Sequence, residues 1–272
     1  MDTYDRAGLY QGGEAFKNVA AFTLSAAEKH AVRFEEAAPV LAHFVCGLAG
    51  RRLEIEAAPA AWTDTATLYL PLRMAAGTSR EQNFLIYKII ATLLWAQSRF
   101  GTFSADLQAA TRQYAEPARA LDWLNYLESV RLEARIAHVL PGLARDLNPL
   151  RGGARESKES QFTLLQKIDA TVADSIALLD TLPLDRDAPR DAWTGALRPA
   201  EAAAKRAARL AQEKDELQAA LAALLAEEAK RNTEDSAGST AGEGETFDVE
   251  TRSNETGELE HEISLGGKPV AA

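Results

Sequence analysis

The chain has 272 residues, of which 46% are hydrophobic and 26% are charged, as in ordinary soluble globular proteins. Its formal net charge is −10, of which the segment from Arg231 onward contributes −7 (ten acidic residues against three basic ones), leaving −3 for the rest. A nearly neutral body with an acidic tail excludes general nucleic-acid binding, which requires a basic surface. The most apolar run, Phe84 to Trp95, is too short to span a bilayer, so no membrane insertion is expected.

The start of the chain and its cysteine content indicate a compartment. The opening MDTYDRAGLYQGG lacks the basic residues and the apolar stretch of a secretory signal. The one cysteine, Cys46, cannot form a disulfide within the chain, which favours a reducing environment. We therefore expect a cytoplasmic protein.

The first part of the chain predicts a helical core domain over residues 24–181, preceded by a loosely ordered lead-in at 1–23. Ser25 and Glu28 have capping-box spacing and predict a helix toward Gly50. The alternating segments Leu53 to Glu56 and Thr67 to Leu70 predict a half-buried hairpin at about 53–71.

Two further helices follow in this core domain. Ser79 and Gln82 again have capping-box spacing, and the apolar residues after them surround the helix, which predicts a central buried helix. Pro117 suits the first turn of the next helix, because its missing amide proton is not needed there. Pro141 and Gly142 are expected to end that helix near Val139.

The last part of the chain contains several segments that differ in composition and in expected structure. An apolar stripe predicts a helix from about Ser160 to Asp180, and the proline-containing segment 182–198 is expected to be a linker. Pro199 opens a long charged helix over 199–231. Residues 232–272 are polar and glutamate-rich, which predicts a disordered acidic tail. The fold class is therefore mainly α, with a small β-hairpin and a long C-terminal helix.

No residue pattern indicates catalysis, a cofactor or a metal. The four histidines are scattered without paired ligand spacing, and no phosphate-binding glycine loop or Ser/His/Asp arrangement occurs. Cys46 follows two apolar residues and is interpreted as a small core residue. We therefore expect no catalytic, cofactor-binding or metal-binding residues.

The sharpest polar cluster lies in LNYLESVRLEARI. Glu128, Arg131 and Arg135 are three and four residues apart, so they share a helix face and can form ion pairs. Glu133 lies on another face, which disfavours a catalytic carboxylate pair with Glu128. Three interpretations are open for the cluster: a solvated ion-pair ladder, a buried polar anchor, or a partner-binding face.

The region 65–145 resembles the N-terminal part of the NorD/CbbO family. The resemblance rests on the order and spacing of several short motifs. These are Tyr69-Leu70-Pro71, then Asn83 and Tyr87, then Phe100-Gly101-Thr102-Phe103, and finally Glu128, Arg131 and Glu133 followed by Pro141-Gly142-Leu143.

The resemblance implies a specific function. Proteins of this family are adaptors of a hexameric MoxR-type AAA+ ATPase and help to activate a target enzyme, as in nitric oxide reductase or Rubisco activation. Their helical N-terminal part contacts the ATPase, and a C-terminal von Willebrand factor A domain binds a metal and the target. This chain would be a non-catalytic adaptor module of that kind, with Glu128, Arg131 and Arg135 as candidate partner contacts.

Two departures from the family leave alternatives open. The sequence has no counterpart of the von Willebrand factor A domain, so we expect a truncated module, a fragment, or one half of a split adaptor. Some relatives carry a His-Glu-x-x-His-like element on the central helix, where this chain has Leu93-Leu94-Trp95-Ala96-Gln97 and no metal ligand. The alternatives are a degenerate metallohydrolase-like protein and a self-associating helical scaffold.

Overall fold

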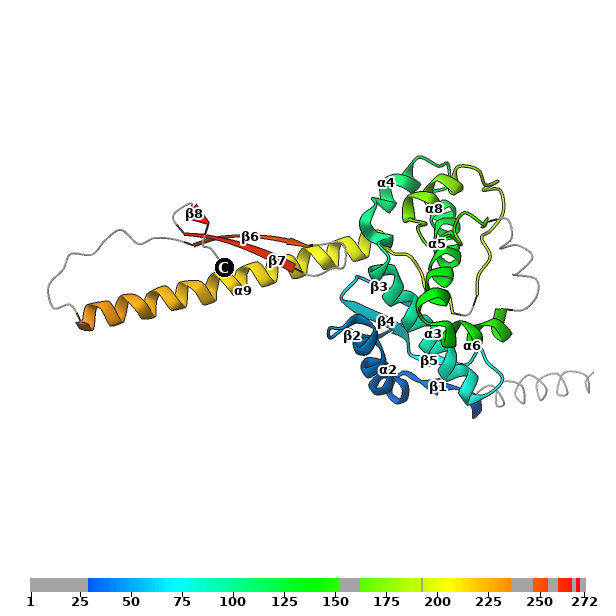
Figure 1. Ribbon diagram of the computed structural model, residues 1–272, viewed down its shortest axis with the longest axis horizontal. Helices are drawn as coiled ribbons and strands as arrows, with labels where there is room; N and C mark the ends of the chain where they lie inside the picture. Colours follow the sequence, from blue (N-terminus) through cyan, green and yellow to red (C-terminus); the bar gives the residue numbers. More distant parts are fainter. Residues whose placement is uncertain are drawn as a thin grey trace, which may run out of the picture.

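The computed structural model describes residues 29–151, 162–191, 193–235, 247–253, 259–265 and 268–269, so the predicted lead-in lies outside the described residues. The fold is mainly α with small sheets and a long C-terminal helix, as predicted. A body of helices and two small sheets carries the projecting helix α9 (Figure 1).

Among the described residues, five short strands lie before α3, helices follow from α3 to α9, and three further strands come after α9. The helices are α2 (Phe34–Ala49), α3 (Arg80–Arg99), the short 3-10 helix η2 (Thr102–Ser104), α4 (Leu107–Arg112), α5 (Pro117–Val139), α6 (Pro141–Arg151), α8 (Val172–Leu179) and α9 (Pro199–Asp235). The strands are β1 (Val32–Arg33), β2 (Glu54–Ala58), β3 (Trp62–Thr63), β4 (Thr67–Pro71), β5 (Arg73–Met74), β6 (Phe247–Ser253), β7 (Leu259–Leu265) and β8 (Lys268–Pro269).

Helix α3 is the central buried helix, as the sequence predicts. The Ser79 hydroxyl accepts a hydrogen bond from the Gln82 amide at 3.2 Å and so caps its first turn. Ile90 and Leu94 are buried in a core shared with α2, the sheet and α6. Each such side chain contributes about 1.5–3 kcal/mol when fully buried. Helix α2 begins only at Phe34, because Val32 and Arg33 pair with β5.

The sheet at 54–71 differs from the predicted hairpin in its pairing. β4 is the middle strand: β3 is antiparallel to it, and β2 is parallel to it on the other side. The hairpin thus joins β3 and β4, and the expected antiparallel pairing of 53–56 with 67–70 is wrong. The reason is the short turn at 64–66, which connects β3 directly to β4 and leaves β2 only the opposite edge.

The predicted linker at 182–198 is irregular in structure but packed into the body. Trp193 and Leu197 are buried, and the Ala196 amide donates to the Ala61 carbonyl at 2.7 Å. Asn125 of α5 donates to the Gly195 carbonyl at 2.6 Å. Pro183 and Pro189 disfavour regular secondary structure in this segment, yet the apolar side chains that follow them are buried. The segment therefore covers the β3 edge instead of separating two domains.

Gly195 provides a test of this packing. A Cβ added there would meet the Ala61 carbonyl oxygen and a Leu94 methyl group at 3.0 Å each. Gly195→Ala is therefore expected to lower the free energy of unfolding by about 1–3 kcal/mol through overpacking. Gly47→Ala is the matched control: nothing lies within 4 Å of the added Cβ, so this helical site should gain about 0.5–1 kcal/mol. Urea unfolding of both variants gives the comparison, and equal stabilities would contradict the close packing.

The helix predicted from about Ser160 to Asp180 is shorter than expected. Residues 162–170 form successive turns, and α8 begins after Thr171. Thr171 and Asp174 form a capping box there, with the Asp174 carboxylate accepting from the Thr171 amide at 2.7 Å. A capping box marks a helix start, so the apolar stripe before it lies on turns.

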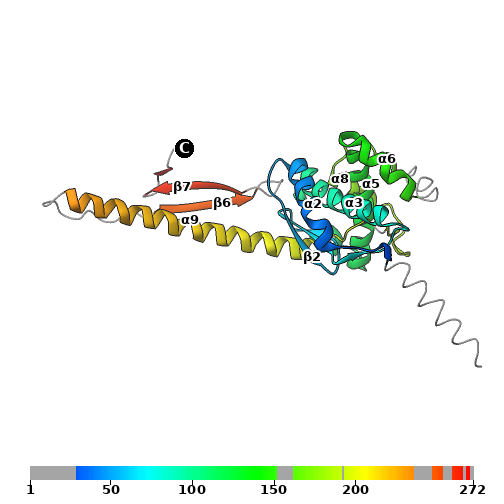
Figure 2. The ribbon, with the colours of Figure 1, turned by 90° about the horizontal axis from the view of Figure 1, so that it is seen from below.

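Helix α9 confirms the long helix predicted at 199–231, and its outer part extends away from the body as an arm. Strands β6 and β7 lie along this arm in both views (Figures 1 and 2). They pair antiparallel, with Val249 opposite Ile263 and Thr251 opposite His261. Val249 is fully buried, and His261 lies 3.9 Å from Glu213 of α9.

These strands correct the prediction of a disordered tail at 232–272 for the residues that the structure describes. The segments FDVETRS and LEHEISL alternate in polarity with a period of two, which is the pattern of a strand with one covered face. The acidic composition concealed this pattern, because the charges lie on the uncovered positions. A sheet of this size becomes stable when it packs on a helix, here α9.

Candidate functional site

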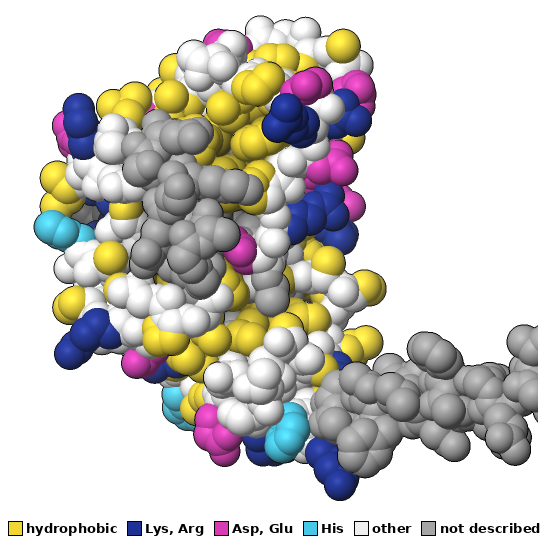
Figure 3. Space-filling model, turned by 90° about the vertical axis from the view of Figure 1, so that its right-hand side faces the viewer, with side chains coloured by type: hydrophobic (Ala, Val, Ile, Leu, Met, Phe, Trp, Pro, Cys, Tyr) yellow, Lys and Arg dark blue, Asp and Glu magenta, His cyan; other side chains and the backbone are white. Residues whose placement is uncertain are grey.

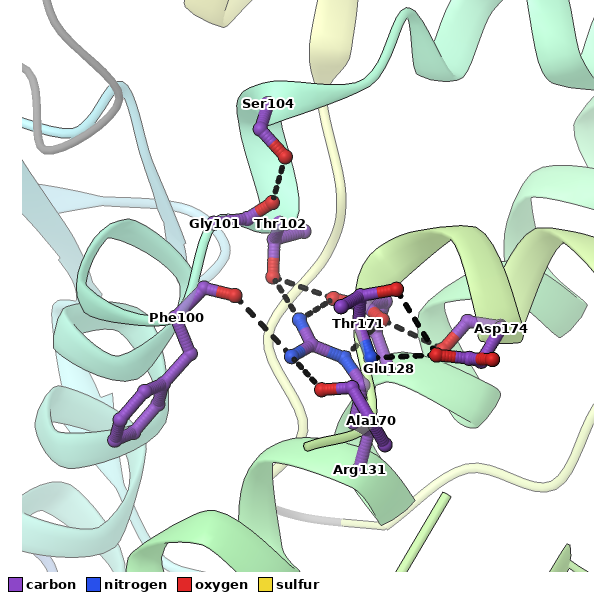
Figure 4. A network of polar contacts seen from close by, with 10 residues as sticks. Phe100, Gly101, Thr102, Ser104, Glu128, Arg131, Ala170, Thr171 and Asp174 are labelled. Atoms are coloured by element: carbon purple, nitrogen blue, oxygen red, sulfur yellow. Dashed lines mark hydrogen bonds and ion pairs between the residues drawn. The ribbon is translucent and has the colours of Figure 1, made fainter. Parts of the chain in front are cut away.

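Glu128 and Arg131 form a buried ion pair inside α5. Both side chains are almost completely excluded from solvent, at 1% and 0% exposure. The Arg131 Nε and Nη2 donate to the two Glu128 carboxylate oxygens at 2.7 and 2.6 Å, the bidentate geometry that makes arginine–carboxylate pairs strong. Figure 4 shows this pair at the meeting point of several segments.

The remaining polar atoms of the pair are satisfied by other segments. The hydroxyls of Thr102 and Ser175 donate to the Glu128 carboxylate at 2.5 and 2.7 Å. Arg131 Nη1 donates to the carbonyls of Phe100, at 3.1 Å, and Ala170, at 3.4 Å. Buried charges are tolerated when every donor and acceptor finds a partner. The pair thus links the end of α3, η2, α5 and the start of α8.

This burial corrects the expectation that Glu128 and Arg131 contact a partner. A side chain with no exposed surface cannot form a docking face, and the interpretation as a buried polar anchor fits instead. The sequence spacing could not separate the two, because an ion pair three residues apart suits a solvated face equally well. The signal that the sequence does contain is that α5 carries apolar residues on all its sides, as helices buried on all sides do.

Arg135 and Glu133 lie on different sides of α5. Arg135 is half-buried, and its guanidinium lies 5.2 Å from the centre of the Phe100 ring. It therefore supports the end of α3 more than it offers a contact surface. Glu133 is buried and accepts a hydrogen bond from the Trp193 indole at 3.3 Å. Glu128 and Glu133 therefore diverge, as predicted: Glu128 faces Thr102 and Ser175, whereas Glu133 faces Trp193.

A second polar cluster joins the start of α3 to the strands. The Tyr87 hydroxyl donates to the Pro71 carbonyl at 2.6 Å. Asn83 donates to the His30 carbonyl at 2.7 Å and accepts from the Gly77 amide at 2.7 Å. Both side chains are fully buried. Two residues that carry the family resemblance, Asn83 and Tyr87, thus fix α3 to β4 and to the segment before β1.

Burial raises the pKa of Tyr87 to about 12 from 10.0, and the nearby carboxylates of Glu35 and Glu36 add to the shift. Between these values the unfolded chain loses the phenol proton while the folded chain keeps it. The stability that Tyr87 contributes is therefore complete below pH 10 and falls as the pH rises above 10. Urea unfolding at pH 9 and pH 11 should show a smaller loss of stability for Tyr87→Phe than for the parent. Equal losses would contradict this assignment.

The base of the arm is held by a turn in the sheet. Asp64 is almost fully buried, and its Oδ1 accepts from the amides of Ala66 and Thr67 at 3.0 and 2.7 Å. Its Oδ2 accepts from Arg209 of α9 at 2.7 Å. Thr65 in this turn has a φ of 83°, an unusual conformation for a β-branched residue. One carboxylate therefore fixes both the turn and the direction of the arm.

Aromatic rings complete the junction between α9 and the body. Trp62 and Tyr69 stack with ring centroids 4.2 Å apart, and Ala202 packs against them without exposed surface. Three basic side chains lie over aromatic rings at centroid distances of 5.4–5.6 Å: Arg198 over Trp62, Lys205 over Tyr69 and Arg206 over Phe103. Such cation–π contacts contribute about 0.5–2 kcal/mol each. The first turns of α9 are thus anchored.

The outer part of the arm presents acidic side chains. On α9 the exposed residues include Asp215 and Glu216. On the uncovered face of the small sheet Asp248, Glu250 and Glu262 are exposed, and Glu250 has Arg252 as its ion-pair partner at 3.0 Å. Lys205, Arg206 and Arg209 lie near the body, where they contact aromatic rings or Asp64, whereas Lys214, Lys230 and Arg231 lie further along α9. The arm thus has an anchored base, and it carries exposed acidic side chains near the middle of α9 and on the small sheet.

A groove lies between α2 and the outer edge of β2. It has a volume of about 560 Å³, and its walls combine mostly small residues of α2, together with His43, with Arg52, Leu53 and the first residues of β2. The α2 wall includes Ala38, Ala42 and the exposed Cys46. Cys46 is therefore not the core residue that its apolar neighbours indicated. The groove could not be predicted from the sequence, because it forms only where residues 52–56 lie beside the small residues of α2.

Within the described ranges, no cluster of three or more His, Cys, Asp or Glu side chains could hold a metal ion. Among those same residues, no helix combines the length and the apolar character that crossing a membrane requires. The face of the body away from the arm shows several hydrophobic patches between polar and charged side chains (Figure 3).

Comparisons with models of protein families, with curated proteins and with solved structures found no match for this chain.

Proposed function

We propose that this chain is a non-catalytic adaptor module that binds a hexameric MoxR-type AAA+ ATPase in the cytoplasm and helps it to remodel a target enzyme. The supporting observation is the convergence of residues that carry the resemblance to the NorD/CbbO family. Tyr87 bonds to Pro71, and Glu128 and Arg131 bond to Thr102 and Phe100. Motifs far apart in the sequence are thus parts of two interlocking clusters, as expected of a shared scaffold.

The arm is the surface that suits a partner. Glu128 and Arg131 are buried, so the proposed docking role passes to the exposed charges of α9. Asp215 and Glu216 are exposed near the middle of α9, and the acidic face of β6 and β7 lies beside the same helix. An anchored, projecting and acidic element fits a basic surface on the ATPase. Electrostatic complementarity of this kind accelerates association and selects the partner.

The test is a binding assay between the purified chain and the MoxR-type ATPase of the same organism in the presence of ATP. The double charge reversal Asp215→Lys/Glu216→Lys should weaken binding about tenfold, equivalent to about 1.4 kcal/mol. The matched control is Asp185→Lys/Asp187→Lys, which reverses two exposed charges on the body.

The control variant should bind like the parent. Unchanged binding by the arm variant, with its circular dichroism intact, would remove the arm from the proposed interface. Equal weakening by both double reversals would mean that net charge, and not a defined surface, governs the association. The absence of binding by the parent chain would contradict the adaptor function itself.

A further inference from the structure

Among the residues that the structure describes, the outer edge of β2 is unpaired and lies beside the α2 groove. In the described sheet β2 pairs with β4 alone, whereas the β3 edge is covered through the hydrogen bond between Ala196 and Ala61. The Glu54 amide donates to the Ala66 carbonyl, toward β4. Because backbone groups alternate in direction along a strand, the amides and carbonyls of Ile55 and Ala57 point toward the open edge. This edge offers donors and acceptors to an added strand.

The side chains around this edge specify what an added strand would carry. Ala38, Ala42 and Cys46 of α2 give a groove of about 560 Å³ its small apolar side chains, and His43 and Arg52 line it as well. Glu54 and Glu56 also line this groove and are exposed, and neither makes an ion pair with a described residue. The pKa of Lys205 on α9 is raised by its hydrogen bond with Tyr69 and, to a smaller extent, by the charge of Glu56. Alternate residues of the added strand would therefore be apolar and basic.

The same glutamates disfavour a second copy of this chain as the occupant. If two β2 strands paired antiparallel about their centre, Glu56 would lie directly opposite Glu56 of the other copy. Like charges in that position destabilise the pair. Natural proteins use charged residues on free edges to prevent such self-association. A strand with basic residues is attracted by these glutamates, whereas a second copy of this chain is repelled by them.

We propose that the β2 edge and the α2 groove together bind an extended peptide segment of a partner protein, in which small apolar and basic residues alternate. The bound segment adds a strand to the sheet, as in other β-augmentation sites. Its backbone pairs with Ile55 and Ala57, its apolar side chains enter the groove against Ala42, and its basic side chains meet Glu54 and Glu56. This site is separate from the arm proposed above and does not depend on it.

The probe is a fluorescein-labelled peptide of four Val-Lys repeats, with blocked ends, titrated against the full chain by fluorescence anisotropy. We expect saturable binding and chemical-shift changes at the amides of Ile55 and Ala57. The Val-Glu analogue and a Val-Lys peptide N-methylated at alternate amides should bind at least about tenfold more weakly, because one loses the charge match and the other the backbone pairing.

Three variants test the geometry. Ala57→Pro removes the outward amide proton while leaving the β2–β4 bonds intact, and should abolish binding. Ala42→Phe fills the groove and should also prevent binding, whereas the matched control Val40→Phe, at a residue 57% exposed on α2, should not. Glu54→Lys/Glu56→Lys should reverse the preference toward the Val-Glu peptide.

Specific outcomes would overturn this proposal. They are equal binding of the Val-Lys and Val-Glu peptides, undiminished binding to the Ala57→Pro variant, and chemical-shift changes confined to residues away from β2. No binding of Val-Lys at millimolar concentration would do the same. Sedimentation of the parent chain as a dimer that Ala57→Pro makes monomeric would instead assign the edge to a second copy. If the chain fails to bind the ATPase in the assay described above, the peptide-binding results keep their meaning, because this site does not depend on the arm.

Discussion

Replacing Arg131 by methionine is expected to lower the free energy of unfolding by about 3–5 kcal/mol. Methionine can fill the space of the arginine stem but leaves the Glu128 carboxylate buried with only the hydroxyls of Thr102 and Ser175 as donors. An uncompensated buried charge is far more costly than the loss of the contact alone. Since small domains are stable by only about 5–15 kcal/mol, urea unfolding followed by circular dichroism should show a large shift of the midpoint.

Two further variants separate the buried charge from the lost contact. Arg190→Met breaks an exposed pair with Asp122 of nearly the same length, 2.7 Å, and should cost only about 0–1 kcal/mol. Adding Glu128→Gln to Arg131→Met removes the orphaned charge, so the double variant should be more stable than Arg131→Met alone. If Arg131→Met is no worse than Arg190→Met, the pair is not the buried anchor described above.

Replacing Asp64 by alanine is expected to cost about 2–4 kcal/mol and to loosen the base of the arm. The substitution leaves the amides of Ala66 and Thr67 without their acceptor in a buried turn, and each unsatisfied amide costs about 1–3 kcal/mol. It also removes the ion pair with Arg209. Hydrogen exchange measured by mass spectrometry should become faster in residues 199–209, in addition to the shift in the unfolding midpoint.

The conservative change Asp64→Asn distinguishes the two roles of this carboxylate. Asparagine can keep the oxygen that accepts from the turn amides but loses the negative charge that faces Arg209. It should therefore speed hydrogen exchange in residues 199–209 with a smaller loss of global stability than Asp64→Ala. Arg209→Met, which removes the same ion pair from the other side, should speed the same exchange but cost more stability than Asp64→Asn, because the Asp64 carboxylate then stays buried without a cation. Unchanged exchange in both variants would show that the aromatic contacts alone hold the arm.

The parts of the fold that follow local rules could be predicted from the sequence. Ser79 caps α3 and Pro117 and Pro199 open α5 and α9, because capping and proline geometry depend only on residues within one turn. The strand pairing at 54–71 could not be predicted in the same way. Two alternating segments fit a hairpin or a parallel pair equally well, and the choice depends on the turn around Asp64.

The candidate sites show the same division between local and long-range information. The spacing of Glu128 and Arg131 predicted that they pair, and they do, but their burial depends on Thr102 and Ser175, which are 26 and 47 residues from Glu128. In the part of the chain that the structure describes, β2 is an edge strand because β4 pairs with β3 on its other side. Such properties belong to the assembled sheet and cannot be read from one segment.

The buried Glu128–Arg131 pair and the exposed arm together explain how the proposed adaptor would connect a bound partner to the body of the protein. An anchor that joins α3, α5 and α8 keeps the body rigid, and the Asp64–Arg209 pair transmits that rigidity to the first turns of α9. A partner that pulls or turns the arm would then act on the whole body and not on a flexible tail.

Affinity purification of the unmodified chain from its own organism, in the presence of ATP and followed by mass spectrometry, tests the adaptor proposal most directly. The proposal predicts recovery of a MoxR-type AAA+ ATPase, together with a further protein that identifies the target enzyme. Recovery of neither, from folded bait at good yield, would contradict the proposed function.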